Sequence, residues 1–266
     1  MGERMRKLYL KRIRTPNLGD TMNDNLMEYL IGKNNFTSVQ HGYGRNHVFI
    51  AIGSILQWAD GKATVWGAGF LTANSSLREQ PKILAVRGPL SREKVLEIGF
   101  KCPEVYGDPA LLYPRFYHPE VKGHGKIGIV THYIDRPSPI FKKFIKENDV
   151  VDIHVQENVN KTVDAIRSCS KIISSSLHGI IIADAYGTPS KWIKITDKVL
   201  GNGFKFRDYF ASVDSTDTEP ILLSSIKSVE QIESIFSDYR KPNINVEYLL
   251  EVFYDYYNKN YKEVIK

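Results

Sequence analysis

Residues 174 to 178, Ser-Ser-Ser-Leu-His, place three hydroxyls and an imidazole at one point of the chain, next to an apolar run, IIIADA. The β-branched stretch KIIS leads into the serines, so the pattern predicts a strand, a turn and a helix that ends near Gly187. A helix start favours negative charge and disfavours an imidazolium. His178 would therefore need an anion nearby to remain protonated, and a bound phosphate or carboxylate would supply it. A satisfied core histidine is the alternative interpretation.

Arg87 and Asp108 are two further candidate residues in the first half of the chain. Arg87 stands between the apolar run KILAV and the GP pair that opens a helix, where its planar guanidinium could bind a carboxylate or phosphate. A bridge to a surface acidic side chain is the alternative. Asp108 lies in the turn GDP, where it could take a proton from a hydroxyl or orient a cation. Its alternative role is to cap its own backbone.

Three further positions could contact a ligand. Gly19 and Asp20 belong to NLGDTMND, a predicted helix start whose amides could bind an anion, although Asp20 could equally cap the helix. His132 ends the predicted strand KIGIVTH, and a buried structural histidine is its alternative role. No DxD motif or paired cysteine spacing is present, so no metal site is expected, and Cys102 and Cys169 are interpreted as reduced thiols.

Short β-branched runs alternate with amphipathic segments along the chain, which predicts an α/β fold. Strands are expected at 7–12, 47–53, 63–69 and 82–88, and then at 126–133, 150–155, 171–176 and 190–195. Helices are expected at 20–32, 88–99, 161–169, after His178 and after Pro242. In the helix at 88–99, one apolar face is expected to contain Leu90, Val95, Leu96 and Ile98.

The segment 113–125, rich in proline, glycine and aromatic residues, interrupts this rhythm and is interpreted as a linker. It predicts two α/β domains, 1–117 and 118–266, with a cleft between them; the first domain, with Arg87 and Asp108 at the cleft, is expected to be the acceptor side, and the second carries the Ser-Leu-His-Gly motif. Ligands of open α/β sheets bind at the carboxyl ends of the strands, where the residues above lie. The final helix is expected to pack back across the domains.

Composition limits the classes of protein that remain. The 266 residues are 42% hydrophobic and 25% charged, enough to bury a core. No run approaches the roughly 20 apolar residues of a membrane span, and no signal segment is recognised, so a cytoplasmic location is expected. The net charge of +6 favours an anionic partner. Nucleic acid is not expected, because the basic runs are short and no aromatic residues are interleaved with them.

Five motifs taken in order resemble the polysaccharide pyruvyltransferases over roughly residues 15–195. They are NLGD, the pair GSILQW and VWGAGF, VRGPLS, YGDPALLYP and SSSLHGIIIADAYGTP. The Ser-Leu-His-Gly form resembles the bacterial exopolysaccharide members. Many relatives carry an arginine immediately before the Leu-His pair, where this chain has Ser176. Any anion contact made by that arginine must here be lost or made by another residue.

The resemblance implies two Rossmann-like domains similar to type B glycosyltransferases. It implies transfer of a pyruvyl group from phosphoenolpyruvate to two hydroxyls of a sugar in a surface polysaccharide or exopolysaccharide, which gives a cyclic ketal and phosphate. His178 is expected to act as a general acid or phosphate ligand, and Asp108 to orient a sugar hydroxyl or accept its proton. Substrate-binding roles are expected for Arg87, Ser175, Ser176, Gly179, His132, Gly19 and Asp20.

The resemblance implies no cofactor, since phosphoenolpyruvate is the donor substrate. The acceptor is expected to be a glycan or lipid-linked oligosaccharide, and the basic charge would suit peripheral contact with an anionic inner membrane face without insertion. Two alternatives remain. One is a nucleotide-sugar-dependent glycosyltransferase of similar fold, and the other is a catalytically silent glycan- or anion-binding relative.

Overall fold

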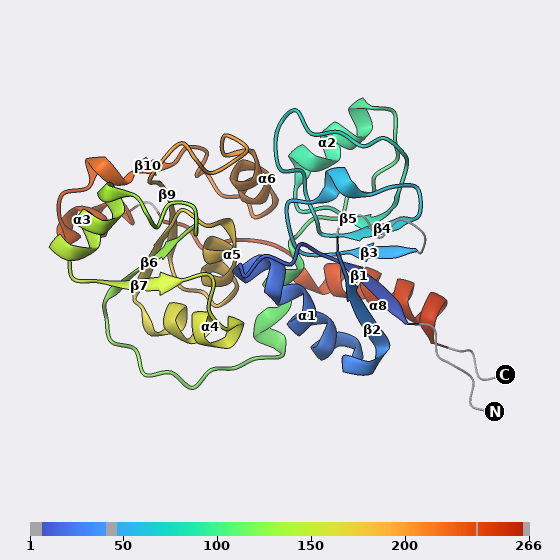
Figure 1. Cartoon of the computed structure of the whole chain (residues 1–266), viewed down its shortest axis with the longest axis horizontal. Coiled ribbons are helices and arrows are strands. Elements are labelled where there is room, and N and C mark those ends of the chain that lie inside the picture. The colour runs from blue at the N-terminus through green and yellow to red at the C-terminus, as the bar shows by residue number, and fades with distance from the viewer. Residues whose placement is uncertain (1–6, 41–46, 238, 263–266) are drawn as a thin grey trace.

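A computed structural model describes residues 7–40, 47–237 and 239–262. Its strands form two five-stranded parallel sheets, which lie side by side in the two halves of the molecule (Figure 1). The first has the order β2-β1-β3-β4-β5 and contains β1 (Leu8–Lys11), β2 (Phe36–Val39), β3 (Val48–Ile50), β4 (Ala63–Trp66) and β5 (Lys82–Ala85). The second has the order β10-β9-β8-β6-β7 and contains β6 (Ile127–Thr131), β7 (Val150–His154), β8 (Lys171–Ser174), β9 (Ser190–Lys194) and β10 (Ile221–Leu222).

Helices make many of the crossover connections that parallel pairing requires, although β4 and β5 are joined by residues 67–81, which contain no helix. The first half has α1 (Leu18–Ile31) and α2 (Pro89–Glu97), with short 3₁₀ turns η1 (Lys33–Asn35), η2 (Leu56–Trp58) and η3 (Pro109–Arg115). The second half has α3 (Pro139–Glu147), α4 (Val159–Ser168), α5 (Leu177–Ala185), α6 (Phe204–Ser212), η4 (Leu223–Ser225) and α7 (Val229–Ser234). The final helix is α8 (Val246–Tyr261). These two α/β units confirm the predicted fold class with its two Rossmann-like domains.

The central strands are apolar because both faces of each sheet are covered. Every residue of β4 and of β6 is buried, which explains why these strands appear in the sequence as continuous rather than alternating apolar runs. Between η3 and β6, residues 116–126 contain no helix or strand. Figure 1 shows this segment, in green, running along the lower edge of the molecule from one half to the other.

Helix α8 returns to the first half of the molecule, as the sequence predicted. It lies below the first sheet in Figure 1, far in sequence from the strands that it contacts. The Trp66 indole nitrogen donates a hydrogen bond of 2.8 Å to the backbone oxygen of Leu249. Phe253 packs against Phe49 and Trp66, with ring centroids 5.7 and 4.6 Å away. The chain therefore crosses between its two halves twice.

The apolar face predicted for α2 is wrong in part. Val95 is fully buried, but the side chains of Leu96 and Ile98 are 42% and 38% exposed. The buried face instead joins Val95 to Ser91, one turn earlier. Ser91 is buried because its amide and hydroxyl bind a carboxylate of α6, so a polar contact decides which face of the helix turns inward.

Candidate active site

The order of the strands points to one region of the molecule. The chain leaves β1 toward β2 on one side and returns to β3 on the other, so the first sheet has a switch point between β1 and β3. The second sheet has one between β6 and β8, since β7 lies on the opposite side of β6. Ligands of open α/β sheets bind in the crevice outside the strand ends at such a point.

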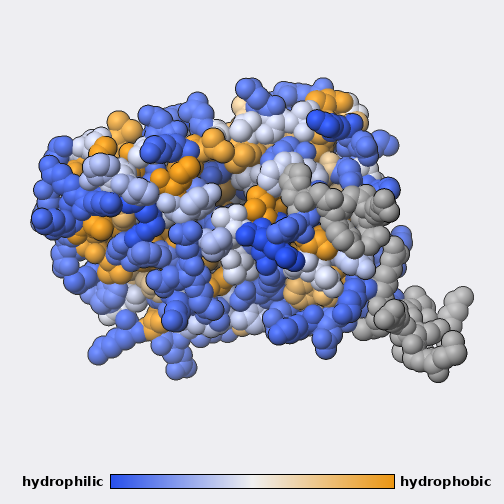
Figure 2. Space-filling view, viewed as in Figure 1, coloured by the Kyte–Doolittle hydropathy of each residue, from blue (hydrophilic) through white to orange (hydrophobic). Residues whose placement is uncertain are grey.

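Both switch points open into one pocket of about 310 Å³, which we call the interdomain pocket. Thr15, which follows β1, and Ser54, which follows β3, line it from the first half. His132, which follows β6, and Ser176, which follows β8, line it from the second half. Figure 2 shows a recess between the two lobes with hydrophobic side chains along it, in agreement with the apolar part of the lining, which includes Ile13, Ile55, Trp58, Leu71, Ile134 and Leu200.

His178 and Asp108, predicted separately to be catalytic, lie together at this pocket. His178 is the second residue of α5, lines the pocket and is 8% exposed. Asp108 is fully buried, and its Oδ2 lies 3.6 Å from His178 Nε2. That separation is too long for a hydrogen bond but short enough for strong electrostatic attraction. Neither atom has a hydrogen-bond partner among the residues that the structure describes.

Asp108 also caps its own backbone, as the alternative role proposed. Its Oδ1 accepts a hydrogen bond of 3.0 Å from the amide of Ala110, which starts η3. The two roles use different oxygens, so they do not compete. Because Asp108 does not line the interdomain pocket, it reaches a substrate only through His178.

The first turn of α1 packs directly on the imidazole. A Cβ atom at Gly19 would lie 2.2 Å from Nδ1 and Cε1 of His178, so only glycine fits there. Gly19 therefore makes room for the catalytic candidate and does not itself line the pocket. Asp20 does line the pocket. Burial raises the pKa of Asp20, and its attraction to His178 opposes part of that rise.

Two helices begin at the interdomain pocket with amides that no cap side chain satisfies. Asn17 precedes α1 and Ser176 precedes α5, and neither side chain accepts a hydrogen bond from its helix. Asn17 Oδ1 is buried without a hydrogen-bond partner among the described residues. Free amides and the positive ends of two helix dipoles at one pocket make a favourable environment for an anion.

The serine turn before α5 divides its side chains among different tasks. Ser174 Oγ contacts the oxygen of Val130 at 2.9 Å and accepts from the amide of Ser176 at 3.0 Å. Ser175 Oγ accepts a 3.0 Å hydrogen bond from the amide of His132 and lines a neighbouring pocket instead. A Cβ at Gly179 would lie 2.5 Å from Ser174 Oγ, so this glycine allows α5 to approach the sheet. Of Ser175, Ser176 and Gly179, only Ser176 lines the interdomain pocket.

His132 lines the interdomain pocket as an uncharged imidazole. Burial, with help from the nearby Lys205 and His178 charges, lowers the pKa of His132 to about 4. Its Nδ1 accepts a hydrogen bond of 3.3 Å from the amide of Ile134, and its ring stacks on Tyr133 with centroids 4.6 Å apart. His132 therefore adds a polar wall but no positive charge at neutral pH.

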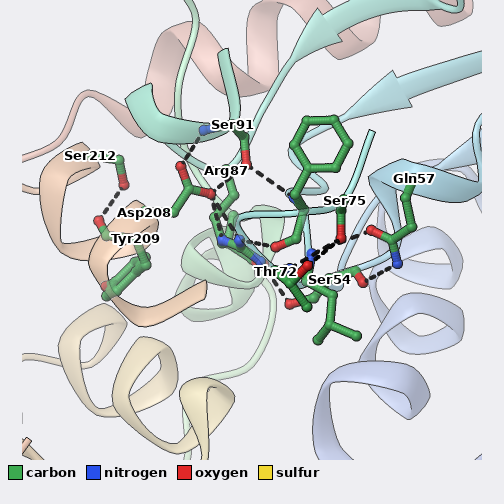
Figure 3. A network of polar contacts seen from close by, with 12 residues as sticks. Ser54, Gln57, Thr72, Ser75, Arg87, Ser91, Asp208, Tyr209 and Ser212 are labelled. Carbon is green, nitrogen blue, oxygen red and sulfur yellow. Dashed lines mark hydrogen bonds and ion pairs between the residues drawn. The ribbon is translucent and has the colours of Figure 1, made fainter. Parts of the chain in front are cut away.

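Arg87 is fully buried and does not line the pocket. Figure 3 shows its guanidinium between Asp208 of α6 and Ser54. Nε and Nη2 lie 3.0 and 2.8 Å from Asp208 Oδ2, while Nη1 donates to Ser54 Oγ at 2.8 Å and Nη2 to the oxygen of Phe70 at 2.8 Å. In this structure the arginine bridges to an acidic residue, as the alternative proposed, but that residue is buried. Arg87 touches the pocket only through Ser54.

Lys205, which the sequence did not single out, supplies the positive charge of this pocket. It stands in the first turn of α6, lines the interdomain pocket and is 8% exposed. No carboxylate lies within 4 Å of its ammonium in the part of the chain that the structure describes. Burial and the charge of Arg87 lower the pKa of Lys205 to about 8, against the opposing attraction of Asp135 and Asp20. The sequence did contain a signal for α6, because Gly203 precedes it and Phe206 and Phe210 are spaced by about one helical turn. In the structure, Gly203 has a left-handed conformation at the start of this helix.

Within 7–40, 47–237 and 239–262, no group of three or more His, Cys, Asp or Glu side chains could hold a metal ion. Over the same residues, no helix is long and apolar enough to cross a bilayer.

Comparison with known proteins places the chain in a family. The family described as polysaccharide pyruvyl transferase matches residues 40–196, more than half of the chain. An uncharacterized protein, L143, of Acanthamoeba polyphaga mimivirus is 26% identical over 206 residues, 75% of this chain and 71% of that protein. The succinoglycan biosynthesis protein ExoV of Rhizobium meliloti (strain 1021) is 28% identical over 214 residues, 75% of this chain and 62% of that protein. No solved structure matches the chain.

The matched region contains Arg87, Asp108 and His178, the residues around which the site is built, whereas Asp20 and Lys205 lie outside it. The family match covers four of the five motifs that suggested the resemblance, and the NLGD motif lies before it. The chain belongs to the polysaccharide pyruvyl transferase family.

Proposed function

We propose that this protein transfers the pyruvyl group of phosphoenolpyruvate to two hydroxyls of a polysaccharide sugar, forming a cyclic ketal and releasing phosphate. Family membership supports a transferase of this class. The observation that carries the donor assignment is the buried side chain of Lys205, whose ammonium has no ion-pair partner among the described residues, in a pocket where two helices begin with uncapped amides. Such a pocket suits a small ligand with several negative charges.

Phosphoenolpyruvate carries a carboxylate and a phosphate on adjacent atoms. In the proposed complex, the amides at the starts of α1 and α5 bind one anionic group and Lys205 binds the other. Lys205 would then supply the positive charge that an arginine supplies in relatives at the position of Ser176. The neutral His132 and the Asn17 carboxamide add hydrogen-bonding groups without further charge.

His178 is proposed as the general acid. It donates a proton to C3 of phosphoenolpyruvate, so the methylene becomes a methyl group and C2 becomes an oxocarbenium-like centre. The first sugar hydroxyl attacks C2, and its proton returns to the imidazole. The C2–O bond to phosphate then breaks, the second hydroxyl attacks C2, and its proton leaves with the phosphate. One proton from each hydroxyl is thereby accounted for.

Asp108 and Arg87 are proposed to position this chemistry without touching the substrate. The buried Asp108 carboxylate stabilises the imidazolium that a general acid requires, offsetting the unfavourable dipole of α5. Arg87 orients Ser54 at the pocket wall and holds Asp208 of α6, the helix that carries Lys205. Both roles follow from contacts at fully buried side chains.

The test is release of inorganic phosphate from phosphoenolpyruvate, measured with a panel of hexosides as acceptors. Acceptor-dependent release is expected from the wild type, with a fall of about 10²–10⁴-fold in kcat for His178→Ala. The matched control is His118→Ala, because His118 is exposed and lies outside the pocket. Its activity should equal that of the wild type.

Thermal shifts separate the competing functions. Phosphoenolpyruvate alone should raise the Tm, since a ligand that binds only the folded state stabilises it. Stabilisation by a nucleotide sugar but not by phosphoenolpyruvate would favour the glycosyltransferase alternative. Stabilisation by phosphoenolpyruvate without turnover on any acceptor, in the presence of an intact His178, would favour a silent binding protein.

A further inference from the structure

A second pocket opens beside the interdomain pocket. It has a volume of about 330 Å³, and we call it the β9 pocket because the end of β9 and the loop after it, residues 195–203, form much of its wall. Asp135, Ser175, Thr196, Asn202 and Phe206 also line it. A volume of this size lies at the lower end of the range of small-molecule sites. The pocket lies at the carboxyl ends of β8 and β9, where ligands of such sheets bind.

The two pockets share one lining residue, and at two further places adjacent residues of the chain line one pocket and the other. Leu200, 68% exposed, lines both of them. Ile134 and Ser176 line the interdomain pocket, and the residues next to them in sequence, Asp135 and Ser175, line the β9 pocket. A ligand that filled both pockets would therefore pass over Leu200 and reach His178.

The charges of the β9 pocket differ from those of its neighbour. Its two basic side chains are already neutralised, because Lys194 pairs with Asp197 at 2.5 Å and Arg207 pairs with Glu219 at 2.8 Å. The remaining ionisable side chain is the buried Asp135, whose pKa burial raises, while hydrogen bonds and the nearby charges of Lys205 and Lys198 oppose that rise. The β9 pocket therefore offers an anion no free cation among its lining residues, whereas Lys205 lines the interdomain pocket. The donor is thus directed to one pocket and an uncharged ligand to the other.

Asp135 provides a specific acceptor for hydroxyl groups. Its side chain is fully buried, and Oδ1 accepts a hydrogen bond of 2.5 Å from Thr196 Oγ1. Oδ2 has no hydrogen-bond partner among the described residues. Such a group left unsatisfied is costly, so a ligand hydroxyl that reached it would gain more than at the surface. Thr196 and Asn202 offer further groups for a ligand rich in hydroxyls.

We propose that the β9 pocket binds an uncharged sugar residue of the acceptor glycan, which continues over Leu200 so that its reacting hydroxyls face the interdomain pocket. The proposal rests on the proposed function for the identity of the acceptor. It rests on the pocket's own geometry and charge for the place where the acceptor binds.

Three variants test this site. Val199→Trp adds an indole to a residue that lines only the β9 pocket, and Asn202→Gly removes the carboxamide while keeping a backbone whose φ is +43°. Asp135→Asn removes the charge of the unpaired carboxylate. The control is Leu222→Trp, which adds the same indole at a side chain that is exposed and lies outside both pockets.

Saturation-transfer NMR with methyl glycosides of galactose, glucose, mannose and N-acetylmannosamine measures sugar binding without turnover. At least one glycoside should receive saturation from the wild type and from Leu222→Trp, and lose most of it with Val199→Trp. In the phosphate-release assay, the acceptor KM should rise at least about tenfold in Asp135→Asn, as expected for loss of a well-made polar contact, and in Val199→Trp, because the indole occupies the pocket. The thermal shift caused by phosphoenolpyruvate should persist in Val199→Trp and Asn202→Gly.

The outcomes separate the two proposals. If Val199→Trp changes neither the acceptor KM nor the saturation transfer, and phosphoenolpyruvate binding is normal, only the acceptor site would be overturned. If the wild type does not bind phosphoenolpyruvate but does bind a sugar, and Val199→Trp abolishes that sugar binding, the proposed function would be overturned while the sugar site would stand. Absence of saturation transfer from the wild type to all four glycosides would overturn the sugar site.

Discussion

At the scale of single residues, His178 is subject to two opposing electrostatic effects, one from the helix that carries it and one from Asp108. The imidazole sits at a helix start that disfavours its charge, and the buried carboxylate 3.6 Å away favours that charge. The anion that the sequence required for His178 is thus present within the protein, before any ligand binds. A bound phosphoenolpyruvate would add to it.

The first prediction concerns Asp108→Asn. The asparagine oxygen can still accept the hydrogen bond from Ala110, so η3 should remain intact, while the charge beside His178 is lost. We expect kcat to fall, but by less than the about 10²–10⁴-fold expected for removing the acid itself, with little change in the KM for phosphoenolpyruvate. Steady-state kinetics measure kcat and KM separately. A KM effect without a kcat effect would contradict the assigned role.

The second prediction is a pH dependence that belongs to Lys205. Its pKa of about 8 means that the side chain is a cation below that pH and loses its charge above it. The affinity for phosphoenolpyruvate should therefore weaken as the pH rises through about 8. Lys205→Met should bind phosphoenolpyruvate weakly and remove this pH dependence, measured by calorimetric titration between pH 6.5 and 9, a range of about 1.5 units below to 1 unit above the pKa.

The control for Lys205 is Lys142→Met, which removes the same charge from an exposed position on α3. Its affinity and pH profile should match those of the wild type. If Lys205→Met kept the wild-type decline in affinity above pH 8, another group would be responsible for it.

At the scale of elements, α6 couples the two halves of the molecule to the pocket. Lys205 and Asp208 are three residues apart, so they lie on neighbouring positions of one helix surface. Asp208 is fixed by Arg87 and by the amide and hydroxyl of Ser91 in α2. A Cβ at Gly88 would lie 1.8 Å from the oxygen of Asp208, so α6 approaches the first half as closely as backbones allow. The position of Lys205 therefore depends on a contact between the halves.

The third prediction tests this coupling with Asp208→Asn. The substitution leaves the Arg87 charge buried without its partner, which should cost about 3–5 kcal/mol of unfolding free energy. Asp149→Asn is the matched control, because Asp149 pairs with Lys126 at the exposed surface and its loss should cost about 0–1 kcal/mol. Urea denaturation measures both. Because α6 carries Lys205, Asp208→Asn should also weaken the affinity for phosphoenolpyruvate, measured by calorimetric titration, whereas Asp149→Asn should leave it unchanged.

At the scale of the whole molecule, α8 ties the end of the chain to the first sheet. Its aromatic side chains pack on Phe49 and Trp66, and its backbone accepts the Trp66 indole hydrogen bond. None of the residues of α8 lines the interdomain pocket or the β9 pocket. The helix therefore contributes packing to the fold and supplies no side chain to the lining of either pocket.

The fourth prediction follows from that division. Phe253→Ala, at a fully buried ring, should lower the unfolding free energy by about 3–5 kcal/mol, measured by chemical denaturation. Tyr248→Ala, on the same helix but 48% exposed, should lower it far less. The activity per folded molecule should equal that of the wild type in both variants. A selective loss of kcat in folded Phe253→Ala would show that α8 also controls the site.

The sequence by itself determined the α/β class, eight of the strands, the helix that carries His178 and the returning C-terminal helix. These features depend on local periodicity and on turn residues, which act over a few positions. It also brought forward His178 and Asp108, because polar groups at strand ends in such folds are few and face the ligand side of the sheet. It did not predict β2, β10, α3, α6 or α7.

Only the tertiary structure decided which charges are free. Arg87 looked available for a ligand, but Asp208, 121 residues later, neutralises it in the interior. Lys205 looked like one of many surface lysines, but its place on α6 at the interdomain pocket leaves it buried and without an ion-pair partner among the described residues. The physical reason is that desolvation and ion pairing depend on contacts between segments far apart in sequence, and no local pattern carries that information.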